Sequence, residues 1–422
     1  MKENKLLRGL CVLTAALMLG LTGCANGSDT NGSDAQSQAD TAEVQSAWTE
    51  LDQTTITKEM GMGWNLGNQL EASNAGIPSE TTWGNPTISE DLIKAVKEQG
   101  FKTVRIPVSY LDKIGAAPDY TIDSAWLDRV QEVVDYVVGN DLYAIINIHG
   151  DGYYTVDKSW LRCVDDNQDE IKDKYEKVWA QIADRFKDYD QHLIFESMNE
   201  ESDNTYGKPN AIGYENINAY NQIFVDTVRK TGSNNEKRWL LIPGWNTNIE
   251  YTAGNYGFVI PTDSGCKADG NRLMISVHYY DPYNFTIDEN MATAKTQWGK
   301  YADYDNWGQE DYVDSTMKKL NDAFVSKGYP VIIGEMGVQN KEHVSDTFGG
   351  FRCYWMEYVV KAAKDNGCIP VYWDNGWNGD KGFGVINRST REITQPDLIA
   401  AMMRAINSDG DYEIAAPKGF EK

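Results

Sequence analysis

Residues 331–335 read VIIGE, a run of aliphatic side chains that ends in a carboxylate. The same arrangement recurs at residues 193–200, LIFESMNE, and a similar apolar run at residues 144–149, AIINIH, ends in an imidazole. Short runs rich in aliphatic and β-branched residues are typical of strands that are buried on both faces, as in parallel sheets. A polar residue at the end of each run marks the edge at which the strand leaves the core. The sequence therefore predicts a parallel sheet with polar groups gathered at one edge.

Apolar runs of this kind alternate with amphipathic segments along most of the chain. The predicted strands are residues 61–66, 103–107, 144–148, 193–197, 239–242, 273–277, 331–334 and 369–373. The predicted helices are residues 89–99, 125–138, 169–186, 216–230, 312–326, 350–365 and 395–405. Eight strands spaced by helices predict an α/β fold, a (β/α)8 TIM barrel made by a single domain with long βα loops. The fifth unit is the weakest, because residues 244–271 show no helical pattern.

The composition is that of an acidic globular protein. Of the 422 residues, 41% are hydrophobic and 24% are charged, and the formal net charge is −24. Such a surface repels phosphate backbones, which argues against nucleic acid as a partner. The chain also contains 13 Trp and 24 Tyr, whose rings suit stacking on the apolar faces of a ligand. No sequence feature indicates an oligomer.

The amino terminus has the pattern of an export signal. Basic residues precede an apolar run over residues 9–21, which is too short to span a bilayer as a helix. The run ends in LTGC, residues 21–24, which resembles a bacterial lipobox. This resemblance implies cleavage before Cys24 and attachment of acyl chains to that residue.

Three segments follow from this pattern. Residues 1–23 are interpreted as a lipoprotein signal peptide. Residues 24–46 are interpreted as a flexible tether, because they contain too few apolar side chains to bury a core. Residues 47–422 would form the barrel domain. Together the segments predict an exported protein, anchored by lipid to the extracytoplasmic face of a bacterial membrane.

Four cysteines lie beyond the predicted tether: Cys163, Cys266, Cys353 and Cys368. They form no CxxC pair and do not have the spacing of a zinc site. Export permits disulfides, but the sequence favours no particular pairing, and buried free thiols are an equal alternative.

The ends of the predicted strands carry a set of polar and aromatic side chains. Its members are Asn65, Asn68, Arg105, His149, Asn199, Glu200, His278, Tyr280, Glu335 and Trp373. In a TIM barrel the active site lies at this edge. Ionisable residues at the ends of buried strands are costly unless they meet in a site. Glu200 and Glu335, on different strands, match the two-carboxylate machinery of glycoside hydrolysis.

Eight segments together resemble glycoside hydrolase family 5, and in particular its branch of bacterial endo-β-1,4-glucanases. They are GMGWNLGNQL (61–70), TTWGNP (81–86), VRIPVS (104–109), INIHGDGYY (146–154), FESMNE (195–200), SVHYYDPYNF (276–285), IIGEMG (332–337) and VYWDNG (371–376). The resemblance implies a retaining enzyme that hydrolyses internal β-1,4-glucosidic bonds of cellulose-like or mixed-linkage glucans. It implies a polysaccharide or oligosaccharide substrate and no cofactor.

The resemblance also assigns catalytic roles. Glu200 matches the acid/base and Glu335 matches the nucleophile. Asn199 matches the amide that binds the 2-hydroxyl of the sugar being cleaved. Arg105 and Tyr280 match the groups that hydrogen-bond the nucleophile and keep it ionised, as a neighbouring cation does.

The remaining members of the set are expected to bind substrate. His149 and His278 match the two histidines of the family site, and Trp373 matches the floor on which the sugar stacks. Asn65 and Asn68 follow the first strand and complete the group.

Two positions depart from the family pattern. Gly150 stands where many members have a second histidine, and Glu201 follows the acid/base where proline is common. Neither change removes a catalytic group, but the missing imidazole removes a contact with sugar.

A metal site is not expected, because the chain has four His and lacks HxH and HExxH pairs.

Alternative functions remain open on sequence alone. The same mechanism would serve xyloglucan, xylan or mannan. A different class is a non-catalytic surface lipoprotein that captures glycans, although the combination of two Glu with Arg105 and Tyr280 favours hydrolysis.

A further expectation concerns the long loop at residues 281–311, where Trp298 and Trp307 are predicted to stack on glucosyl units beyond the cleavage point.

Overall fold

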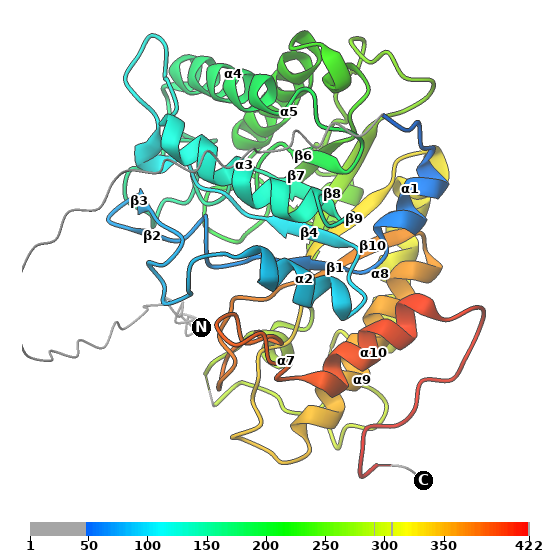
Figure 1. Ribbon diagram of the computed structural model, residues 1–422. Helices are drawn as coiled ribbons and strands as arrows, with labels where there is room; N and C mark the ends of the chain where they lie inside the picture. Colours follow the sequence, from blue (N-terminus) through cyan, green and yellow to red (C-terminus); the bar gives the residue numbers. More distant parts are fainter. Residues whose placement is uncertain (1–47, 291, 305–306, 421–422) are drawn as a thin grey trace, which may run out of the picture. The chain divides into compact units, whose positions relative to one another are not determined.

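The computed structural model describes residues 48–420 apart from residues 291, 305 and 306 (Figure 1). These residues belong to one compact unit, Val44–Lys422. The predictions for the signal peptide, for lipidation of Cys24 and for the tether fall on residues 1–46, outside the described residues.

Within the described residues, eight parallel strands close into a barrel in the order β1-β10-β9-β8-β7-β6-β5-β4. The strands are β1 (Gly63–Asn65), β4 (Thr103–Ile106), β5 (Tyr143–Ile146), β6 (Leu193–Glu196), β7 (Leu240–Asn248), β8 (Leu273–Tyr279), β9 (Val331–Met336) and β10 (Cys368–Tyr372). Pairing of Trp64 with Tyr372 joins the first strand to the last. The predicted TIM barrel is therefore confirmed, and each predicted strand overlaps an observed one.

Helices follow the strands as the amphipathic pattern predicted (Figure 1). The longer ones are α1 (Gln53–Met60), α2 (Glu90–Glu98), α3 (Ser124–Val138), α4 (Gln168–Arg185), α5 (Ala211–Lys230), α8 (Glu310–Ala323), α9 (Phe348–Asp365) and α10 (Pro396–Asn407). The short helices are α6 (Ile249–Ala253) and α7 (Tyr283–Thr286), and β2 (Ser73–Asn74) pairs with β3 (Ile77–Pro78). The fifth unit contains only α6, which agrees with its weak helical pattern.

Polar N-cap residues explain where two of the helices begin. The side chain of Ser89 accepts a hydrogen bond from the amide of Leu92, and Asp123 does the same for Trp126 at the start of α3. These caps satisfy amide groups that have no partner within a helix. Residues 350–365 and 216–230 were predicted as helices from their apolar period, but α9 and α5 begin two and five residues earlier.

The apolar core has two parts. The larger one lies between the strands and the helices that cover them. The smaller one joins residues of α1, such as Ile56 and Met60, to inward side chains of the strands, such as Ile145 and Ile332. Alternation along a strand sends neighbouring side chains to opposite faces, so Ile145 belongs to the smaller part and Ala144 to the larger. α1 had no counterpart in the sequence prediction.

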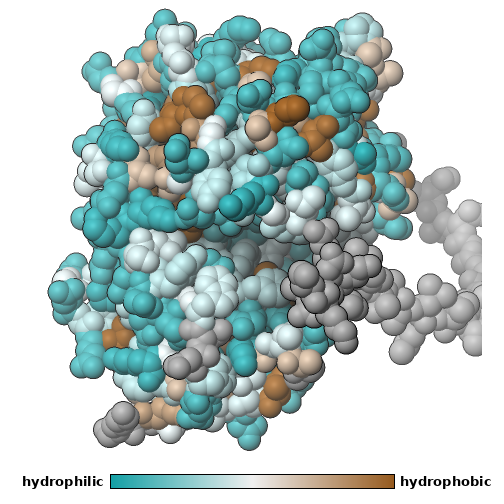
Figure 2. Space-filling view, turned by 180° about the vertical axis from the view of Figure 1, so that it is seen from behind, coloured by the Kyte–Doolittle hydropathy of each residue, from teal (hydrophilic) through white to brown (hydrophobic). Residues whose placement is uncertain are grey.

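The cysteines form no disulfide within the described residues, and the face of the molecule shown in Figure 2 is mainly polar. Cys163, Cys266, Cys353 and Cys368 are all free thiols; Cys163 and Cys368 are buried, whereas Cys266 and Cys353 are partly exposed. No helix within residues 48–420, as described, combines the length and apolar character needed to cross a membrane. Figure 2 shows a largely hydrophilic face on which hydrophobic residues form small separate patches.

Candidate active site

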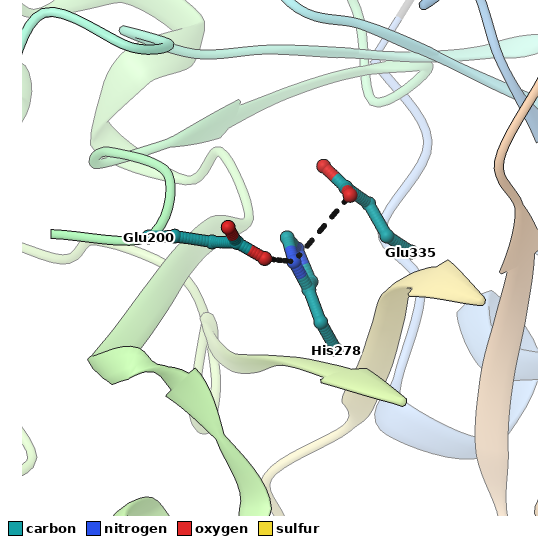
Figure 3. A group of neighbouring side chains, drawn as sticks. All are labelled: Glu200, His278 and Glu335. Atoms are coloured by element: carbon teal, nitrogen blue, oxygen red, sulfur yellow. Dashed lines mark hydrogen bonds and ion pairs between the residues drawn. The ribbon is translucent and has the colours of Figure 1, made fainter. Parts of the chain in front are cut away.

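Glu200 and Glu335 come together at the carboxyl ends of β6 and β9. Each offers a carboxylate oxygen to a group that also includes the imidazole of His278, and the three atoms lie within 4.8 Å of one another. Nδ1 of His278 is 2.6 Å from Oε1 of Glu200 and 3.7 Å from Oε2 of Glu335 (Figure 3). Gly334 leaves room for the imidazole, because a Cβ there would stand 3.2 Å from Nε2 of His278, closer than ordinary van der Waals contact.

Arg105 is the centre of a buried hydrogen-bond network beneath Glu335. Its Nη1 donates to Oε1 of Glu335 at 2.9 Å and to Oδ1 of Asn65 at 3.0 Å, and its Nη2 donates to Oδ1 of Asn199 at 2.7 Å. The hydroxyl of Tyr280 donates to the second oxygen of Glu335 at 3.1 Å. Both oxygens of this carboxylate therefore accept hydrogen bonds, one of them from a cation.

Asn65 has a structural as well as an electrostatic task. Its Nδ2 donates to the carbonyl oxygens of Gly334 and Tyr372, on β9 and β10. The amide therefore joins the first strand to the last two and aims its own oxygen at Arg105. The sequence prediction placed Asn65 among the substrate-binding residues; in the structure its side chain is fully buried and hydrogen-bonds to β9, β10 and Arg105.

Glu196 is a site residue that the sequence analysis missed. It is fully buried, and its Oε2 accepts from Nε of Arg105 at 2.7 Å and from Nδ2 of Asn147 at 2.9 Å. Its Oε1 accepts from the hydroxyl of Ser276 at 2.6 Å. The sequence does contain a sign of this role. Glu196 directly follows the apolar residues 193–195 within the strand, at a position whose side chain points into the barrel.

Tyr153 is a second missed residue, and it contacts Glu200. Its hydroxyl accepts from Nδ2 of Asn199 at 2.6 Å and donates to Oε2 of Glu200 at 3.3 Å. The motif INIHGDGYY contains Tyr153, but the sequence could not show which of its polar residues face the carboxylates.

The protonation of the two carboxyl groups is coupled. Burial raises the pKa of Glu335, while the charges of His278 and Arg105 oppose that rise. Burial also raises the pKa of Glu200, but the hydrogen bond and charge of His278 outweigh it and hold that pKa below its ordinary value. Groups this close titrate together. The hydrogen bond between Nδ1 of His278 and Oε1 of Glu200 therefore stabilises the ionised form of Glu200 in the free enzyme.

His149 and Trp373 form the opposite wall. The two rings stack with centroids 6.2 Å apart and planes 12° apart. Burial lowers the pKa of His149 well below its ordinary value, and the charges of Arg105 and His278 lower it further, so the imidazole is neutral. A Cβ on Gly67 would lie 2.7 Å from the Trp373 ring, so only glycine fits against the back of this indole.

A cavity of about 330 Å³ opens in front of these groups. Its lining includes Asn68, Trp83, His149, Tyr153, Glu335 and Trp373. Trp83 is 42% exposed at the rim, and its Nε1 donates to the carbonyl of Ser73 in β2. The small hairpin β2–β3 therefore holds an indole ring beside the cavity.

The three potential ligands Glu200, His278 and Glu335 are also the group within the described residues that resembles a metal site. Arg105 lies 2.9 Å from Glu335 and already supplies positive charge there. A cation between the carboxylates would be repelled by this guanidinium. The arrangement is better suited to proton transfer and nucleophilic attack than to metal binding.

Comparison with known proteins identifies the family of this chain. The family model described as cellulase (glycosyl hydrolase family 5) matches residues 65–379. The chain belongs to glycosyl hydrolase family 5. It is therefore a glycoside hydrolase of the cellulase type, and the family 5 match spans the barrel from β1 to the loop after β10.

Similar proteins come from several bacteria. The chain is 54% identical to endoglucanase A of Paenibacillus barcinonensis over 359 residues, which cover 83% of this chain and 89% of that one. A family 5 xyloglucanase from Paenibacillus pabuli, solved with a ligand, has 53% identity and a TM-score of 0.82 over 83% of this chain and all of that one. A broad-specificity endoglucanase from Bacteroides salanitronis has 39% identity and a TM-score of 0.79, over 89% and 100% of the two chains.

The expectation for the loop after β8 was wrong for Trp298. This indole is fully buried, packs on the rings of Tyr354 and Tyr358, and donates from Nε1 to the carbonyl of Gly308 at 2.7 Å. Trp307 is 53% exposed and packs edge-on against Tyr312. Neither tryptophan is part of the cavity lining, because Trp298 packs on α9 and Trp307 packs on α8.

Replacement of Trp298 by alanine should therefore act on stability. We expect the free energy of unfolding to fall by about 3–5 kcal/mol, as for other buried tryptophans, with KM for long glucans unchanged below the melting temperature. Denaturant unfolding and initial rates measure the two effects. A raised KM in a protein of unchanged stability would restore the binding role.

Proposed function

We propose that the protein is a retaining endo-β-1,4-glucanase that cleaves internal bonds of cellulose-like, mixed-linkage and xyloglucan chains. The observation that carries the proposal is the pair Glu200 and Glu335, with oxygens within 4.8 Å and one of them clamped by Arg105. Retaining glycosidases place their carboxyl groups about 5–5.5 Å apart, whereas inverting enzymes leave room for a water between them. The names of the similar endoglucanases and of the xyloglucanase support the choice of glycan.

In the first step Glu335 attacks the anomeric carbon and Glu200 gives its proton to the departing glycosidic oxygen. The carbon–oxygen bond to the leaving chain breaks as the ester bond to Glu335 forms. Arg105 and Tyr280 keep the attacking carboxylate ionised and oriented through hydrogen bonds of 2.9 and 3.1 Å. Nδ1 of His278 lies 2.6 Å from Oε1 of Glu200, within hydrogen-bond distance for moving a proton to or from this carboxyl group.

In the second step Glu200 acts as a base. Ester formation removes the negative charge of Glu335, and His278 continues to favour the ionised form of Glu200, so its pKa falls. Glu200 then takes a proton from water, the resulting nucleophile attacks the same carbon, and Glu335 leaves as a carboxylate. Two displacements at one carbon retain its configuration.

The cavity walls supply the substrate contacts. We assign Trp373 as the stacking floor for the sugar being cleaved and Trp83 as a second ring at the rim. Nδ2 of Asn199 donates to Tyr153, and we assign the pair to the 2-hydroxyl of that sugar. His149 and Asn68 line the same cavity and complete the binding set.

A substrate panel tests the proposal. The purified protein is incubated with carboxymethylcellulose, lichenan, xyloglucan, xylan and mannan, and release of reducing ends is measured. We expect release from the first three, with the β-anomer appearing first in NMR spectra of the earliest products. First appearance of the α-anomer would contradict retention. Binding without release from any glycan would favour the alternative of a glycan-capturing lipoprotein.

We also propose that the enzyme is exported and anchored through a lipidated Cys24. The support is the sequence alone, an apolar run ending in LTGC at residues 21–24. Cys24→Ala should move activity from the membrane fraction to the soluble export fraction, because acylation at two positions is enough for stable anchoring. Fractionation of cells that express the wild-type and mutant chains measures this, and an unchanged distribution would rule out the anchor.

A further inference from the structure

The residue beside Glu200 has an unusual side chain. Glu201 is 1% exposed, and among the described residues the backbone amide of Gly152 is the one group near enough to act as a donor to its carboxyl oxygens, without forming a well-aligned hydrogen bond. An ionised carboxylate without a partner is strongly disfavoured in the protein interior, whereas a neutral acid is tolerated. Proline is common at this position in the family, and the proposed mechanism gives Glu201 no task.

Glu201 lies against both ends of a loop segment that follows β5. A Cβ placed on Gly152 would stand 1.5 Å from Oε2 of Glu201 and 2.5 Å from the carbonyl oxygen of Leu161. The carboxyl group therefore occupies the space that glycine leaves and lies close to a carbonyl oxygen. Two acceptors repel each other, but a protonated carboxyl group can donate to the carbonyl. On its other side, the carbonyl of Glu201 accepts from the amide of Asn246.

Among the described residues, the titratable groups with the largest electrostatic interactions with Glu201 are acids. They are Asp151 and Tyr153 of the same loop, Cys163 near its end, Glu200, Tyr175 of α4 and Tyr220 of α5. Lys174 of α4 acts on Asp151. Burial raises the pKa of Glu201 well above its ordinary value, and the charges of Asp151 and Glu200 raise it further. The amide of Gly152 offsets only part of this rise.

We propose that Glu201 is a positioning residue that works as a neutral carboxylic acid, donating from its hydroxyl to the carbonyl oxygen of Leu161. This hydrogen bond ties the loop after β5 to the end of β6. The loop carries Tyr153, directly after Gly152, and the Tyr153 hydroxyl contacts both Asn199 and Glu200. Glu201 thus fixes the position of Tyr153, whose hydroxyl contacts the acid/base Glu200, from the side of the loop that faces away from the cavity.

The first test is the pH dependence of stability, measured on the full chain. Glu201→Gln keeps a hydrogen-bond donor and stays neutral, and Glu215→Gln on the exposed face of α5 is the control for the change in net charge. A carboxyl group whose pKa is raised by folding stabilises fully below its unfolded pKa and loses that stabilisation as the pH rises through the folded value. The wild-type Tm should therefore fall with pH relative to Glu201→Gln.

Between about pH 5 and about pH 9 we expect the Tm difference between Glu201→Gln and wild type to grow by about 2 °C or more. The difference between Glu215→Gln and wild type should stay constant over the same range. A Glu201→Gln difference that stays constant, or that reverses as the pH rises, would overturn the proposal. This measurement does not depend on the function proposed for the site.

The second test is kinetic and rests on the acid/base role proposed for Glu200. At about pH 6 Glu201→Gln should keep kcat within about twofold, whereas Glu201→Ala should lower kcat about tenfold with KM little changed, because Tyr153 and Glu200 lose their alignment. Equal kcat values for the two variants would overturn the positioning role.

The alkaline limb of kcat/KM distinguishes a neutral residue from a charged one. In Glu201→Gln this limb should stay in place, since no charge is removed beside Glu200. A shift of the limb to lower pH would mean that wild-type Glu201 carries a negative charge, and it would overturn the proposal. If the wild-type chain hydrolyses no glycan, the proposed function fails and the Tm measurement alone decides about Glu201.

Discussion

Glu335→Gln should lower kcat/KM by roughly 10⁴–10⁶-fold on polysaccharide and on activated aryl glycosides alike, the size of loss that removal of a nucleophile causes in other enzymes. The amide cannot form the ester intermediate, whatever the leaving group. Its shape is preserved, so Arg105 can still donate to the side-chain oxygen and the fold should remain intact. Rates on carboxymethylcellulose and on an aryl cellobioside measure the effect, and circular dichroism checks the fold.

Glu200→Gln is the matched comparison, because it removes the proton donor and keeps Glu335. Formation of the glycosyl-enzyme from an aryl glycoside with a good leaving group needs little protonation and should be spared. Hydrolysis of polysaccharide should still be lost, since a sugar hydroxyl is a poor leaving group. An equal loss for both variants on both substrates would contradict the proposed division of roles.

Arg105→Met should have the second largest effect, on activity and stability together. The change leaves Glu196 and Glu335 without the cation that lies 2.7 and 2.9 Å from them. Breaking a buried ion pair by removing one partner costs about 3–5 kcal/mol of unfolding free energy. Loss of the guanidinium also disfavours the carboxylate form of Glu335, so the acid limb of kcat/KM should move to higher pH.

The double variant Arg105→Met with Glu196→Gln is the control for this interpretation. It removes one of the two unpaired carboxylates, so part of the lost stability should return while activity stays low. Denaturant unfolding of the wild type, both single variants and the double variant completes the cycle. Additive losses would show that Arg105 and Glu196 do not act as a pair.

Sequence reasoning found most of the candidate site for a specific physical reason. Side chains such as Glu335 and His149 stand directly after apolar runs, and parallel strands bring their carboxyl ends to one edge. Each predicted strand overlapped an observed one, because a strand buried on both faces must be almost entirely apolar. Asn65 was found by the same rule, although its contacts join strands of the barrel.

Glu196 and Tyr153 could not be found in this way, because neither stands directly after the end of a predicted strand. Glu196 lies inside a strand, where its burial is acceptable only because Arg105, Asn147 and Ser276 from other strands surround it. Tyr153 lies in a loop, where no period of the sequence fixes the direction of a side chain. Contacts between such residues depend on how distant segments pack, and a linear pattern does not contain that information.

The sequence by itself determined the barrel, the edge on which its polar residues gather and the position of Glu200 and Glu335 at that edge, because periodicity and strand ends are local properties of the chain. Only the tertiary structure decided which residues surround those carboxylates. It placed the imidazole of His278 beside Glu200, put Trp298 in the core rather than in the cleft, and buried the carboxyl group of Glu201 with no side-chain donor among the described residues. The physical reason is that burial and hydrogen bonding are set by neighbours in space, which come from strands and loops far apart in the chain.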